Sequence, residues 1–102
     1  MHVINIATYP LKAVAEVGKL FVEGLKDDPL PDYVKLLGLY VEYGGKGITT
    51  YDIFEIEKGH EDEGFKALAK NQIKYYDVEG YEVTSKTVLA AEEALPLIGL
   101  GM

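Results

Sequence analysis

The stretch from Val34 to Glu57, VKLLGLYVEYGGKGITTYDIFEIE, constrains the fold of this chain more than any other. Its two halves are rich in β-branched, aromatic and leucine residues. They are separated by Gly44-Gly45-Lys46-Gly47, which supplies the positive φ angles that a tight reversal needs. This pattern predicts a long β-hairpin. Both faces of its strands are apolar near the middle, so we expect something to cover each face.

The length of the turn decides which side chains share a face, because a slip of one residue exchanges the faces. A three-residue loop with Gly47 at a bulge places Tyr43 opposite Gly47 and Asp52 opposite Gly38. Asp52 then lies on the open face of the sheet, away from the helices. That face also holds Leu36, Tyr40, Glu42, Ile48, Thr50 and Phe54. A two- or four-residue turn would bury Asp52 under the helices, which is costly for a lone carboxylate. We therefore expect the three-residue turn.

The rest of the chain predicts further strands and helices. His2 to Tyr9 and Tyr81 to Val88 have the composition of short strands. Leu11 to Lys26 and the segment after Glu61 carry apolar residues at spacings of three and four, which predicts amphipathic helices. The expected buried residues are Leu11, Val14, Val17, Phe21 and Leu25 in the first helix and Phe65, Leu68, Ala69, Ile73 and Tyr76 in the second. Leu89 to Leu100 predicts a short helix, distorted by a proline, with an apolar tail that docks on another surface.

This order of elements predicts the α+β class. With right-handed connections, both long helices lie on one side of a four-stranded antiparallel sheet, in a ferredoxin-like βαββαβ sandwich with an extra C-terminal helix. We expect a single such domain over residues 1–102. An apolar open face of this size is rare on a soluble monomer, so the expected cover is a second copy of the chain in a symmetric dimer.

The element order, the chain length and the long hairpin resemble the ferredoxin-like dimeric α+β barrel superfamily, from Val3 to about Leu89. That superfamily includes cofactor-independent monooxygenases of the antibiotic-biosynthesis type, haem-degrading proteins and muconolactone isomerase-like proteins. The resemblance implies a homodimer with a pocket between the sheet and the elements that partly cover it. It carries over no catalytic residue, and the tryptophan of the haem-degrading members is absent from this chain.

Composition narrows the classes of partner. The chain has 17 acidic residues against 10 lysines and no arginine, for a net charge of -7. Such a chain is poorly suited to nucleic acids, anionic membranes or polyphosphates. Without cysteine it has no disulfide and no thiolate site, and no stretch approaches the roughly 20 apolar residues of a membrane span. We expect a cytoplasmic protein that binds no nucleic acid and no membrane.

Two motifs have structural explanations. A phosphate-binding loop is followed by a helix, whereas a strand is expected after Gly44 to Thr49. The acidic run after His60 lacks the second histidine of a helical zinc site, because Gly64 stands at that position, and its acids suit the first turn of a helix. A site that combines His60 with His2 has no supporting spacing. We therefore expect no metal and no cofactor.

The strongest candidate site surrounds Asp52. A carboxylate beside aromatic rings and away from bulk water has a raised pKa, so it can accept or donate a proton near neutral pH. Asp52 is therefore the candidate catalytic acid or base. The expected ligand-binding residues are Asn5, Tyr40, Glu42, Thr50 and Phe54. The structural alternative is that Asp52 is hydrogen-bonded at a dimer seam or is solvated.

Two functions of different classes are consistent with these features. The first is a homodimer that binds a small apolar or aromatic molecule on the open sheet face, with cofactor-free monooxygenase or isomerase chemistry as the candidate reaction. The second is a non-catalytic assembly or regulatory module whose open face is filled by its partner chain. A polar-lined cavity would favour the first function, and a dry, filled seam would favour the second.

Overall fold

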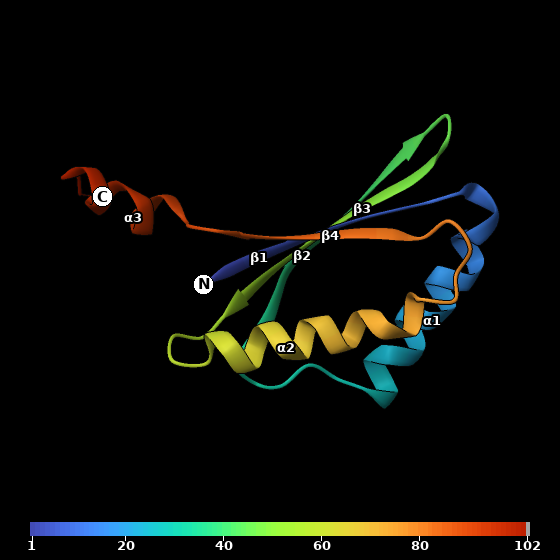
Figure 1. Ribbon diagram of the computed structural model, residues 1–102, viewed down its shortest axis with the longest axis horizontal. Coiled ribbons are helices and arrows are strands. Elements are labelled where there is room, and N and C mark those ends of the chain that lie inside the picture. Colours follow the sequence, from blue (N-terminus) through green and yellow to red (C-terminus); the bar gives the residue numbers. More distant parts are fainter. Residues whose placement is uncertain (102) are drawn as a thin grey trace.

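The computed structural model describes residues 1–101, which fold as an α+β unit (Figure 1). Within this range one antiparallel sheet contains the strands β1 (His2–Tyr9), β2 (Val34–Gly44), β3 (Gly47–Ile56) and β4 (Glu82–Val88). The long helices α1 (Val14–Asp27) and α2 (Glu61–Gln72) both lie on one side of this sheet. Short 3₁₀ turns precede α1 (Leu11–Ala13) and follow α2 (Ile73–Tyr75). The expected class, sheet and placement of helices are confirmed, and β1 has the predicted bounds.

The strand order places β1 inside the sheet. The strands lie in the order β2-β3-β1-β4, and each neighbouring pair is antiparallel. Asn5, in the middle of β1, lies opposite Asp52 of β3 on one side and opposite Ser85 of β4 on the other. Three polar residues therefore cross the centre of the sheet in one row.

The hairpin turn differs from the predicted one. Gly44 pairs with Gly47, so the loop consists of the two residues between them. Asp52 consequently pairs with Leu39 and lines a cavity under α1, on the helix face of the sheet. The predicted three-residue turn, and with it the placement of Asp52 on the open face, is wrong.

Burial of β3 explains this register. Ile48, Phe54 and Ile56 share a face with Asp52 and are 2%, 7% and 1% exposed. Complete burial of such a side chain contributes about 1.5 to 3 kcal/mol. Three of these contributions exceed the cost of burying one carboxylate, because a carboxylate can reduce that cost by taking up a proton. The alternative register would turn all three apolar side chains away from the helices.

The buried stripe of α2 is also displaced from the predicted one. Leu68 is buried as expected, but Ile73 and Tyr76 are exposed, while Gly64, Gln72 and the following Tyr75 are buried. The cause is a close approach of α2 to β3. A Cβ atom on Gly64 would lie 2.5 Å from Cγ2 of Ile56, so the helix turns its glycine toward the sheet.

Helix α1 covers the sheet incompletely. Val17 is buried, as predicted, whereas Leu11 and Leu25 are 57% and 59% exposed. On the facing edge strand β2, Leu39 and Val41 are also exposed on the helix side. An apolar opening therefore runs between α1 and β2.

Two apolar clusters form the core. One, near the hairpin turn, contains Tyr9, Ala13, Val17, Ile48, Tyr75 and Val78. The other, at the opposite end of the sheet, contains Val3, Val34, Phe54, Ile56 and Leu68. Along β1 and β3, Asn5 and Asp52 lie between the two clusters. This polar break in the core marks the site described below.

The C-terminal segment, here called the C-terminal arm (residues 89–101), projects beyond the end of β4 and away from the helices (Figure 1). It contains α3 (Ala91–Ala94) and a 3₁₀ turn (Leu95–Ile98) that begins beside Pro96. Leu97 and Ile98 are 74% and 72% exposed. No helix in residues 1–101 has the length and apolar character needed to cross a membrane.

Candidate functional site

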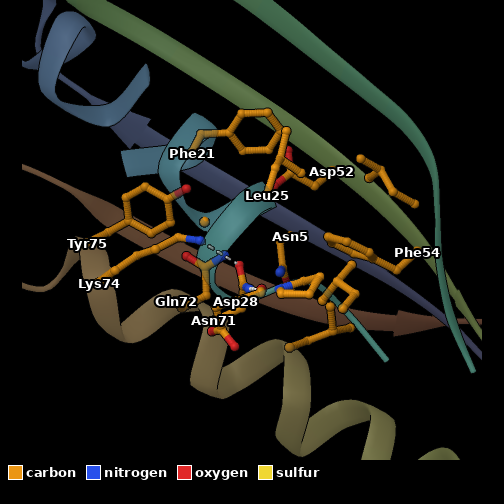
Figure 2. Close-up of a pocket in the computed structure, with 15 residues that line it drawn as sticks. Asn5, Phe21, Leu25, Asp28, Asp52, Phe54, Asn71, Gln72, Lys74 and Tyr75 are labelled. Carbon is orange, nitrogen blue, oxygen red and sulfur yellow. Dashed lines mark hydrogen bonds between the residues drawn. The ribbon is translucent and has the colours of Figure 1, made fainter. Parts of the chain in front are cut away.

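A cavity of about 170 Å³ lies between α1 and the sheet. An apolar cavity of about 150 Å³ is large enough to hold a benzene ring. The cavity is lined by Tyr9, Val17, Gly18, Phe21, Leu39, Val41, Thr50, Asp52, Tyr75 and Tyr81. A narrower space of about 50 Å³ shares Phe21, Asp52 and Tyr75 with it and extends toward α2. Figure 2 shows this narrower space and labels Phe21, Leu25, Asp52, Phe54 and Tyr75 among the residues that line it.

Asp52 is the charged group at the junction of the two spaces. Its Oδ1 atom is buried and has no hydrogen-bond partner within residues 1–101. Burial raises the pKa of Asp52 from its ordinary 3.8 to about 6. The carboxyl group therefore exchanges its proton close to neutral pH, and its buried Oδ1 has unsatisfied hydrogen-bonding capacity.

Asn5 is fixed beside Asp52 by a hydrogen bond from β4. Its side chain is 2% exposed, and the Oγ of Ser85 donates to its Oδ1 at 2.6 Å. This hydrogen bond holds the amide group in place, because moving the side chain away would leave buried polar atoms unpaired. Asn5 is thus a preorganised polar group in the wall of the narrower space.

Tyrosines form the end of the cavity near the hairpin turn. The rings of Tyr75 and Tyr81 stack at 4.9 Å, and those of Tyr9 and Tyr81 at 5.9 Å. The Tyr81 hydroxyl donates to Oε1 of the buried Gln72 at 2.8 Å. Burial, with a smaller effect from the charge of Asp52, raises the pKa of Tyr75 to about 12. Burial is also the main cause of the raised pKa values of Tyr9 and Tyr81. The phenols therefore stay protonated and can act as hydrogen-bond donors.

The predicted site residues separate into two groups. Asn5, Thr50, Asp52 and Phe54 line the two spaces on the helix face. Tyr40 and Glu42 lie on the opposite face, where β2 pairs them with Tyr51 and Thr49. There the Tyr51 hydroxyl donates to Oε1 of Glu42 at 2.7 Å. The prediction that Tyr40 and Glu42 share a cavity with Asp52 is wrong. The hairpin turn is one residue shorter than predicted, so these two side chains lie on the face opposite Asp52.

Several lining residues were not anticipated from the sequence. They come from β1, from α1, from the end of α2 and the turn after it, and from the residue before β4, and they are Tyr9, Gly18, Phe21, Gln72, Lys74, Tyr75 and Tyr81. One signal was available, because Gln72 and Tyr75 continue the spacing of Gly64 and Leu68. The stacking of tyrosines from β1, from the turn after α2 and from the position just before β4 had no local signal.

Metal ligation finds no support in residues 1–101, where no group of three His, Cys, Asp or Glu side chains is placed to hold an ion. His60 instead stacks on Tyr33, with ring centroids 4.4 Å apart, and its Nδ1 lies 3.8 Å from Oε2 of Glu63. His60 immediately precedes α2, and the acidic run forms the first turn of that helix.

Comparison with known proteins adds little to this picture. No protein-family model matches the chain, and no curated protein matches it. Among solved structures, the chain is similar to the solution structure of the C-terminal domain of the MgtC protein from Mycobacterium tuberculosis. The TM-score is 0.46 and the sequence identity 14%, over 90% of this chain and 95% of that one. A likeness at this level carries over neither fold nor function, so the site must be interpreted from its own residues.

Proposed function

We propose that this protein binds a small apolar or aromatic molecule in the cavity between α1 and the sheet, and that Asp52 exchanges a proton with it. The observation that carries the proposal is that Asp52, whose Oδ1 is buried and unpaired, lines a largely apolar cavity of about 170 Å³. Binding an apolar ligand there would also cover side chains that are now open to water between α1 and β2.

Isomerisation is the reaction that these groups serve best. A single base can take a proton from one atom of an enol or ketone and return it to another, without any further reactant. A carboxylate whose pKa is about 6 is suited to both steps near neutral pH. The protonated hydroxyls of Tyr9 and Tyr75 supply donors for a carbonyl or phenol oxygen, whereas the Tyr81 proton is already donated to Gln72. Monooxygenation would begin with the same proton removal and would also require dioxygen.

The cavity can be blocked without disturbing the fold. Gly18 lines the cavity, and no heavy atom lies within 4 Å of the place that its Cβ would occupy. Leucine at this position therefore enters open space, and it also has a higher helix propensity than glycine by nearly 1 kcal/mol. Ala15→Leu, at an exposed position of the same helix, adds a comparable side chain outside the cavity and is the matched control.

The test is a titration of the labelled protein with phenol and with cyclohex-2-enone, followed by amide chemical shifts. Saturable shifts should centre on Thr50, Asp52 and Tyr75. They should disappear in Gly18→Leu and persist in Ala15→Leu. Deuterium incorporation into the enone should fall in Asp52→Asn. Saturable binding that Gly18→Leu leaves unchanged, or no binding in the wild type, would refute the proposal.

We also propose a ferredoxin-like topology that assembles as a dimeric α+β barrel. The strand order β2-β3-β1-β4, with both helices on one face, supports a split βαβ topology. A homodimer is supported by the open face, where Ile4 pairs with Ile53 and Ile6 with Tyr51, and by the exposed apolar C-terminal arm. Sedimentation of the full chain and of a chain that ends at Leu89 tests the assembly. A full chain that remains monomeric at high concentration would refute it.

The exposed arm also favours a second candidate function, a non-catalytic assembly module. In that case Leu97 and Ile98 seat on another chain and the cavity stays empty. Truncation after Leu89 should weaken assembly under either function, so Gly18→Leu is the variant that distinguishes them. It should abolish ligand binding under the first function and change no binding property under the second.

A further inference from the structure

Lys74 occupies an unusual position between the two long helices. Its side chain leaves the turn after α2 and lies across Gly24 of α1, where a Cβ atom would collide with Nζ and lie 3.1 Å from Cε. Gly24 is buried in the interior of α1, a place where glycine costs about 1 kcal/mol relative to alanine. The glycine is thus explained by the space that the ammonium group needs.

The ammonium group is partly buried and only partly paired. Nζ donates to Oδ1 of Asn71 at 3.2 Å and lies 5.4 Å from the centre of the Tyr75 ring. Asn71 is itself oriented, because its Nδ2 donates to the backbone oxygen of Asp28 at 3.4 Å. An ammonium has three N–H donors, and Asn71 is its hydrogen-bond acceptor within residues 1–101. Donors therefore remain for a ligand.

Lys74 lines the narrower space, on the side away from Phe54 (Figure 2). That space of about 50 Å³ has room for a small polar group, while the adjoining cavity of about 170 Å³ has room for a ring. Phe21, Asp52 and Tyr75 line both spaces, so the two spaces are adjacent, and the ligand considered below is one that extends across both. The polar end of such a ligand would approach Lys74, and its apolar body would lie near Asp52.

We infer that Lys74 binds the carboxylate of the ligand, so that the ligands are small aromatic or apolar monocarboxylic acids. This inference rests on the proposed function, because it uses the same cavity. A carboxylate satisfies the spare donors and compensates a charge that is partly removed from water. Burial lowers the pKa of Lys74, while the nearby Asp28 opposes that change. Asp28 itself is exposed, so water screens its effect on an incoming anion.

Phenylacetate and its neutral isostere phenylacetamide separate charge recognition from cavity binding. Calorimetry on the full-length protein at pH 7.5 should show phenylacetate binding about tenfold more tightly, as expected for a charge-assisted hydrogen bond. Lys74→Met keeps most of the unbranched side chain and removes the charge. The acid and the amide should then bind about equally, while binding of the amide remains. Lys70→Met makes the same change at an exposed position of α2 and should keep the preference.

Gly24→Ala provides a second, independent variant. Its methyl group displaces the ammonium without removing the charge from the protein, so the preference for the acid should also fall. Equal binding of the acid and the amide by the wild type would overturn the role of Lys74 and leave the proposed cavity intact. A preference that survives in Lys74→Met would also overturn it. If neither compound shifts the amide signals of Asp52 and Thr50, both the inference and the proposed function fail.

Discussion

Replacing Asp52 by asparagine should stabilise the protein at pH 8 and leave its stability almost unchanged at pH 4. Asparagine has nearly the same shape but carries no charge in either state. At pH 8 the wild-type carboxylate is ionised and fully hydrated when the chain unfolds, but ionised and partly desolvated when it folds. Near pH 4 the folded state holds the carboxyl group protonated, so the cost of desolvating a charge is absent.

The magnitude follows from the change in the pKa of Asp52, which burial raises from 3.8 to about 6. Because the folded state binds the proton more tightly, stability is greatest below pH 3.8 and falls until the pH passes about 6. Each pH unit between the two pKa values corresponds to about 1.4 kcal/mol, which gives about 3 kcal/mol in total. Water at the mouth of the cavity screens the charge, so we expect a gain of about 2 kcal/mol for Asp52→Asn.

Urea unfolding followed by circular dichroism at pH 4, 5, 6, 7 and 8 measures this effect. The protein concentration must stay constant, because assembly would itself add stability. Asp32→Asn removes an exposed aspartate outside the cavity and is the matched control. A difference between Asp52→Asn and the wild type that does not grow between pH 4 and pH 8 would contradict the reasoning. A loss of stability in Asp52→Asn at pH 8 would show that the carboxylate has a partner.

Substitutions at three further positions test the surroundings of the site by urea unfolding. Tyr81→Phe removes the donor to the buried Oε1 of Gln72 and should cost about 1 to 2 kcal/mol, whereas no change would mean that water reaches Gln72. Ser85→Ala should cost about 1 kcal/mol by removing the donor to Asn5, and Ser85→Thr should restore it. Gly64→Ala should cost about 1 to 3 kcal/mol, because its Cβ would lie 2.5 Å from Cγ2 of Ile56. A neutral Gly64→Ala would contradict the close approach of α2 to β3.

The position of the candidate site explains why its carboxylate was anticipated and its surroundings were not. Asp52 stands out locally because it interrupts a run of aromatic and aliphatic residues, and Asn5 stands out in β1 in the same way. Asn5 and Asp52 become neighbours because β1 pairs with β3 in one particular antiparallel register. Neither strand's own sequence requires that register. Tyr40 and Glu42 were assigned to the same face by a turn one residue longer than the actual one.

The amino-acid sequence by itself determined the strands, the helices and their order, because alternation, helical spacing and turn-forming residues act over a few neighbouring positions. Only the tertiary structure decided the register of the hairpin and the rotation of α2. Gly44 to Gly47 can close a hairpin in more than one way, and the choice came from burying Ile48, Phe54 and Ile56 together. The rotation of α2 came from the contact of Gly64 with Ile56. Burial of these side chains and the Gly64 contact depend on surfaces that meet only when distant segments pack. The same packing places Asp52 inside the protein.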